Sequence, residues 1–165
     1  MDQEPYIPYE ISDLALIYSV PLLFIGGLVS VIYGQKIMGF LQFVVYATSI
    51  LFWSHIGKDN TIRHVDMTCA TLLLIWGTYV STYYLPSVRY IWYYSLGTSL
   101  CVFAANEAVF FIGIGFCKTE EWRTYMTYQA VIIHMIFLHI LPVFTGIYCV
   151  IMGKPSVKYM ISSNR

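Results

Sequence analysis

The sequence predicts an all-α fold, a polytopic transmembrane helix bundle of about five spans in one domain, and three observations lead to this prediction. Hydrophobic residues make up 58% of the 165 residues and charged residues only 11%, whereas a soluble domain has roughly a quarter charged residues. The mean hydropathy is +0.66. Long apolar stretches recur along the chain, and Tyr and Trp cluster near their ends, as they do at membrane interfaces.

Each span is placed from its apolar residues, because about twenty of them are needed to cross a bilayer. The first span contains Pro21 and the Gly26-Gly27 pair, which membrane helices tolerate. The fourth is long enough to be divided near Asn106 and Glu107, but each half would be too short to cross, so it is counted once. The expected spans are residues 11–33, 37–57, 66–85, 90–117 and 125–152.

The distribution of basic residues predicts the orientation. An odd number of spans places the two termini on opposite sides of the membrane. The C-terminal side carries five basic residues and no acidic one, and the N-terminal side carries four basic residues together with most of the acids. Because cytoplasmic loops are enriched in Lys and Arg, we expect a cytoplasmic C-terminus and a lumenal or extracellular N-terminus.

Charge and length also limit the partners. The net charge is zero and there is no dense Lys/Arg cluster, so the chain has nothing with which to neutralise a row of phosphates. We therefore expect no binding of nucleic acid. The spans leave no room for a soluble enzyme domain, so any chemistry must lie among the helices. The expected partners are membrane lipids and the other chains of a homo- or hetero-oligomer in the membrane.

Glu107 is an ionisable residue inside an apolar span, and such residues need a partner. It lies eleven positions before Lys118, and His134 lies eleven positions after Arg123. If the loop between Lys118 and Arg123 closes a helical hairpin, both side chains are about 16 Å from that loop. We therefore predict that Glu107 and His134 form a hydrogen bond or an ion pair.

His134 and His139 are the two histidines of the last span, and they are five residues apart. On a regular α-helix this spacing points them about 140° away from each other. One regular helix therefore cannot direct both at one metal ion. A π-bulge between them would bring them to the same face, and Pro142 shows that this end of the span is irregular, but nothing in the sequence requires a bulge.

His55 ends the second span, and Asp66 opens the third span eleven residues later. With the two histidines of the last span, this pattern resembles the CREST superfamily of membrane metal-dependent hydrolases, which includes alkaline ceramidases and progestin and adipoQ receptors. The resemblance implies that His55 binds Zn²⁺, that Asp66 hydrogen-bonds a metal ligand or the metal-bound water, and that His134 or His139 is a further ligand.

The match to this family is partial. The family has an HxxxH pair in its last span and usually seven spans. It also has a Ser four residues before its first His, where this chain has Leu51. If Ser49 is aligned with that Ser, the His position is occupied by Trp53, which cannot bind zinc.

Three functions follow as alternatives from these residues. The leading interpretation is a non-catalytic membrane component, or a reduced CREST-like relative without metal, in which the histidines only hydrogen-bond neighbouring helices. The second is a zinc-dependent hydrolase of lipid amide or ester bonds, with Asp66 as the catalytic acid or base. The third is a haem-binding electron-transfer protein that uses His55 and His134 from facing helices.

Overall fold

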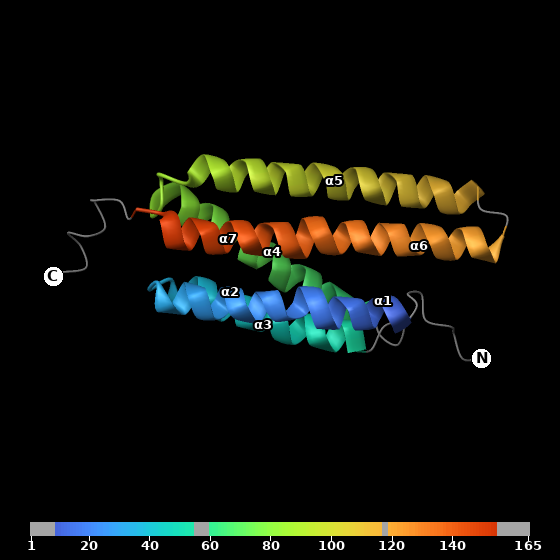
Figure 1. The fold of residues 1–165 in the computed structure, drawn as a ribbon, viewed down its shortest axis with the longest axis horizontal. Helices are drawn as coiled ribbons and strands as arrows, with labels where there is room; N and C mark the ends of the chain where they lie inside the picture. The colour runs from blue at the N-terminus through green and yellow to red at the C-terminus, as the bar shows by residue number, and fades with distance from the viewer. Residues whose placement is uncertain (1–8, 55–59, 117–118, 155–165) are drawn as a thin grey trace.

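The structure, a computed structural model, describes residues 9–54, 60–116 and 119–154. These residues form five long helices that run along one common axis (Figure 1). The first and the last of the five each contain a short π-helical segment. In chain order the elements are α1 (Tyr9–Leu14), η1 (Ala15–Ser19), α2 (Val20–Ile32), α3 (Lys36–Ser54), α4 (Asn60–Tyr83), α5 (Arg89–Phe116), α6 (Glu120–His134), η2 (Met135–Ile140) and α7 (Leu141–Met152). The prediction of an all-α bundle is confirmed.

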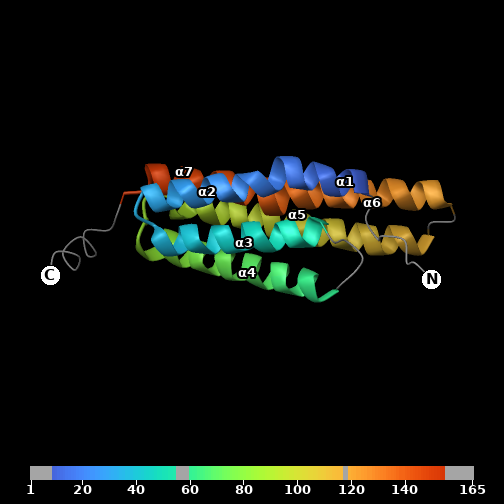
Figure 2. The same ribbon diagram turned by 90° about the horizontal axis from the view of Figure 1, so that it is seen from below.

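Four of these helices are long and apolar enough to cross a membrane, so by length and composition the protein is a multi-pass helical membrane protein. They are Ser12–Ile32, Lys36–Ser54, Arg89–Gly113 and Glu120–Met152. α4, the remaining expected span, has 24 residues, but Arg63, His64 and Asp66 make its first half more polar. It still runs along the bundle beside α3 (Figure 2).

α4 and α6 begin before their apolar stretches do. α4 begins at Asn60 and α6 at Glu120, whereas the expected spans began at residues 66 and 125. The hydroxyl of Thr119 accepts the backbone N–H of Trp122 at 3.3 Å and caps α6. The two acidic residues in the first turn of α6 also suit the positive end of the helix dipole. Charged residues thus mark the edge of an apolar stretch but not the end of a helix.

α2 and α3 form an antiparallel hairpin with a close helix contact. The turn between them contains Gly34 at φ +81°, a left-handed conformation that glycine adopts without strain. Gly39 of α3 faces α2, and a Cβ atom at this position would lie 2.8 Å from the backbone oxygen of Gly27. The missing side chain therefore allows the two backbones to approach each other, as small residues do in membrane bundles.

α5 forms the second hairpin, with the continuous helix of α6, η2 and α7 lying beside it (Figure 1). α5 is unbroken from Arg89 to Phe116, so the fourth span is not divided. α7 also packs against α2 and joins the two hairpins. At the end where α5 and α6 are connected, both helices extend beyond α1 and α3 (Figures 1 and 2).

The contact at Gly39 gives a first testable prediction. Gly39→Ala overpacks the interface between α2 and α3, and we expect it to destabilise the folded protein by about 1–3 kcal/mol. Gly115→Ala is the matched control, because a Cβ atom there meets nothing within 4 Å. Thermal unfolding in detergent micelles measures both. A Gly39→Ala protein as stable as the Gly115→Ala protein would show that α2 and α3 do not approach closely at this point.

Candidate functional site

Asp66 is buried in α4 and accepts two hydrogen bonds from α3. Its Oδ1 atom accepts the hydroxyl of Thr48 at 2.7 Å and the hydroxyl of Ser49 at 2.8 Å. Because α4 begins six residues earlier, Asp66 is in the second turn of this helix and not at its start, as the sequence suggested. One carboxylate oxygen is thus engaged in holding α4 against α3.

Trp53 lies one helical turn beyond Ser49 on α3 and is almost completely buried. It belongs to the same apolar cluster as Met135 of η2. Its backbone carbonyl accepts the hydroxyl of Ser12 from α1. Its Nε1–H group has no hydrogen-bond partner among the described residues. An indole therefore fills the space between the end of α3 and the last long helix.

His134 and His139 lie on the same side of the last helix, with their ring centroids 5.4 Å apart. The expectation that they point apart is wrong, because it assumed a regular α-helix between them. Residues 135–140 instead form the π-helix η2, in which the N–H of Leu141 donates to the carbonyl of Ile136, five residues earlier. In this hydrogen-bond pattern, residues five apart stack on one face.

Pro142 provides the physical reason for the π-helix. A proline has no N–H group, and its ring excludes the carbonyl of the residue four positions before it, here Leu138. The helix accommodates the proline by widening the turn that contains Leu138. The sequence contained this signal in the proline, but the direction and size of the adjustment depend on the neighbouring helices.

The first long helix contains the same arrangement. η1 (Ala15–Ser19) ends two residues before Pro21, and the N–H of Val20 donates to the carbonyl of Ala15. The hydroxyl of Ser19 donates to the same carbonyl at 3.0 Å. The segments η1 and η2 pack against each other. The two irregular turns therefore meet in the interior of the bundle.

Glu107 and His134 do not form the predicted pair. The ring of His134 instead packs edge-on against Phe103 of α5, with centroids 5.5 Å apart. Phe103 precedes Glu107 by one helical turn. Among the described residues, Glu107 has no hydrogen-bond or ion-pair partner.

The reason is the register of the hairpin between α5 and α6. The prediction placed the hairpin ends at Lys118 and Arg123, but α5 ends at Phe116 and α6 begins at Glu120. Glu107 is therefore nine positions from its end of the hairpin, and His134 is fourteen positions from the other end. His134 lies roughly 7 Å deeper than Glu107 along the helix axis.

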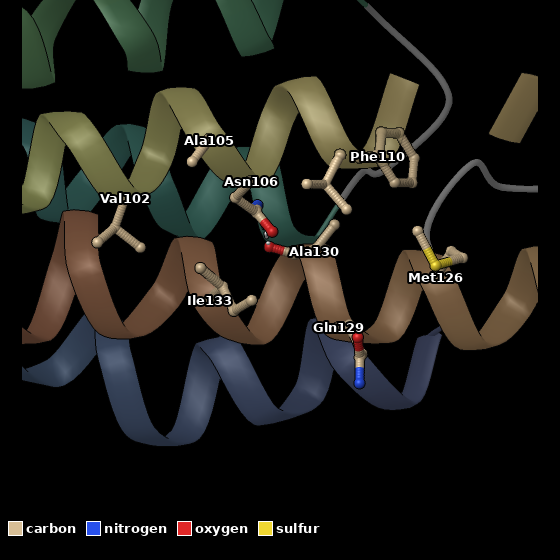
Figure 3. Close-up of a pocket in the computed structure, with 9 residues that line it drawn as sticks. Val102, Ala105, Asn106, Phe110, Met126, Gln129, Ala130 and Ile133 are labelled. Atoms are coloured by element: carbon tan, nitrogen blue, oxygen red, sulfur yellow. Dashed lines mark hydrogen bonds between the residues drawn. The ribbon is translucent and has the colours of Figure 1, made fainter. Parts of the chain in front are cut away.

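Asn106, which the sequence analysis did not select, makes the polar contact between α5 and α6. Its Nδ2 atom donates to the backbone carbonyl of Ala130 at 3.0 Å, and its side chain is buried. It lines a groove of about 230 Å³ between the two helices, together with apolar side chains and Gln129 (Figure 3). The available signal was a polar residue inside an apolar span.

Other polar side chains also link neighbouring helices. Four such hydrogen bonds were not expected from the sequence. They are Ser30 Oγ to Gln42 Oε1 at 2.8 Å, Thr145 Oγ1 to Ser95 Oγ at 2.8 Å, Trp92 Nε1 to Thr78 Oγ1 at 3.0 Å, and the bond between the hydroxyls of Thr82 and Tyr93 at 2.6 Å.

The expected metal ligands are only partly brought together. His55 lies outside the described residues, and Asp66 is engaged with α3. Within residues 9–54, 60–116 and 119–154, no group of three or more His, Cys, Asp or Glu side chains could hold a metal ion. A catalytic zinc site uses three protein ligands. The described residues therefore supply the pair His134 and His139 but do not complete a zinc site.

Comparisons with known proteins returned no match: no family model, no curated protein and no solved structure is similar to the chain. The resemblance to the CREST superfamily thus rests on the residues of this chain alone.

The bonds of Asp66 give a second prediction. Asp66→Ala removes both hydrogen bonds to α3, and we expect a loss of about 2 kcal/mol in the free energy of unfolding. Ser49→Ala removes one of them and should cost less. The effects should not add in the double variant, because both substitutions remove the same bond.

Thr71→Val is the matched control, since the hydroxyl of Thr71 bonds only to its own helix, at the carbonyl of Met67. Unfolding in detergent, followed by circular dichroism, measures all four proteins. Additive losses from Asp66→Ala and Ser49→Ala would contradict the observed contact.

Proposed function

We propose that the protein is a non-catalytic, multi-pass membrane component whose interior polar residues hold its helices together. The observation behind this proposal is the bonding of Asp66, the residue with the strongest catalytic expectation. Its Oδ1 atom is engaged by two hydroxyls of α3. Gln42, Asn106 and Thr145 bond to neighbouring helices in the same way. In a bilayer such bonds are a structural requirement, because lipid offers no hydrogen-bond partner.

We also propose that the chain is a reduced relative of the CREST superfamily that binds no metal. In the alignment that places Ser49 at the position of the family's Ser, this serine donates a hydrogen bond to Asp66. In that alignment the first metal-binding His is replaced by Trp53. The buried indole of Trp53 fills space beside the last helix, where it cannot act as a zinc ligand.

A second candidate function, metal binding by the last helix, is favoured by one observation. The π-helix η2 places the rings of His134 and His139 5.4 Å apart, which a regular helix would not do. The remaining ligands would have to come from outside the described residues, where His55 lies. The haem alternative also needs His55, together with His134, and it stays a prediction.

Metal analysis of the detergent-purified full chain distinguishes these functions. We expect zinc and iron well below one atom per chain by mass spectrometry, no Soret band, and no hydrolysis of ceramide or phospholipid. The His134→Ala/His139→Ala variant should give the same metal content, and it should differ from the parent only in stability.

The contrary result is equally clear. Near one zinc per chain, lost in the double variant, would overturn the non-catalytic proposal and establish metal binding by this pair. A His55→Ala variant that also lost the metal would identify the further ligand. Iron with a Soret band that His55→Ala and His134→Ala each abolish would establish the haem alternative.

A further inference from the structure

α5 is the least buried of the four candidate spans. Only 17% of its span is buried inside the protein, against 33% to 39% for the other three. Its inner face packs on α6, η2 and α7, and its first two turns also contact α4. Its outer face has no neighbour among the described helices. A membrane protein presents such a face to lipid or to another membrane helix.

The outer face of α5 carries small residues at alternating spacings of three and four. Gly97, Cys101, Ala104 and Ala108 are all exposed and follow one another in this pattern, with Tyr94 before them and Phe111 after them. We call these six residues the α5 seam. In heptad notation the six seam residues occupy alternating a and d positions. This spacing keeps one face of a helix against a partner helix over several turns. Small side chains at such positions allow close backbone approach in membranes.

Glu107 lies at the edge of this seam, directly before Ala108. It is partly exposed and has no hydrogen-bond or ion-pair partner among the described residues. In heptad terms it is a flanking g position, and charges at flanking e and g positions determine which partner a helix pairs with. An unpaired carboxylate inside an apolar span is costly, so its natural partner is a cation at the same depth.

Within the four candidate spans, a second copy of the chain offers no cation at the depth of Glu107. In these spans Lys and Arg occur only near the ends, at Lys36, Arg89 and Arg123. In a parallel pair of α5 helices, an e position of the partner faces Glu107. The e positions beside this seam are Thr98, Ala105 and Ile112, none of which is basic. Charge complementarity therefore favours a different protein.

We propose that the α5 seam docks a transmembrane helix of a partner protein that carries a Lys or Arg at the depth of Glu107. This inference rests on the proposed function and names the kind of partner that the membrane component would bind. The seam supplies the close approach, and the Glu107 carboxylate accepts hydrogen bonds from the partner's cation. Each buried charge then compensates for the other.

The test uses the full chain in phosphatidylcholine vesicles with synthetic transmembrane helices as probes. One probe carries a single Lys at the depth of Glu107 in a leucine and alanine helix, and the second has Leu at that position. Binding is measured by energy transfer between labels on the chain and the probe. We expect the Lys probe to bind about tenfold more tightly than the Leu probe.

Three variants of the chain identify the contact. Glu107→Gln keeps the size of the side chain and should abolish the preference for the Lys probe. Asp13→Asn removes one exposed acid of the first span and should leave the preference unchanged. Ala104→Leu/Ala108→Leu fills the seam and should weaken the binding of both probes. Circular dichroism checks that each variant is folded.

Equal binding of the two probes, or a Lys preference retained in Glu107→Gln, would overturn the inference. So would energy transfer between two labelled copies of the chain that the Ala104→Leu/Ala108→Leu variant abolishes, because the seam would then be a homodimer interface. These outcomes are separate from the proposed function, which fails on metal content or lipid hydrolysis.

Discussion

Two prolines determine how the interior of this bundle is arranged. Pro21 and Pro142 each remove a backbone donor from a long membrane helix, and each is preceded by a π-helical turn. Because η1 and η2 pack against each other, the wider turns are placed at one level and not spread along the bundle. The same adjustment rotates His139 onto the face of His134. A backbone constraint thus sets the side-chain geometry of the only described histidine pair.

The polar contacts of the bundle follow from the lack of water in a bilayer. A hydroxyl or carboxamide inside a span must find its partner within the protein. Ser30 with Gln42, and Ser95 with Thr145, each join two helices that also share apolar contacts. Asp66 is the acidic member of this set, and its two hydroxyl partners are adjacent residues on one helix. Such bonds select one helix register, because a shifted helix would leave them unmade.

The sequence was sufficient for the fold class and for most of the helices, because apolar length and charge position are local properties. It was insufficient for the site, because the site depends on how far neighbouring helices are shifted relative to each other along their axes. The predicted contact between Glu107 and His134 required the ends of two helices to be known within about one turn. Thr119 caps α6 outside the apolar stretch, so α6 begins earlier than predicted and His134 lies further from the hairpin end. Likewise, Pro142 was visible in the sequence, but its effect on His134 and His139 depended on which turn widened.

The two faces of α5 differ in a way that connects the fold to the proposed assembly. Its inner face uses Asn106 and Phe103 to meet α6, and these contacts are complete within the chain. Glu107 lies next to Asn106 and is turned away from that contact by the geometry of the helix. A carboxylate that has no partner among the described residues, beside a seam of small residues, adds nothing to the stability of the described bundle. Its cost is offset only when a partner supplies a cation, so the residue contributes to assembly and not to folding.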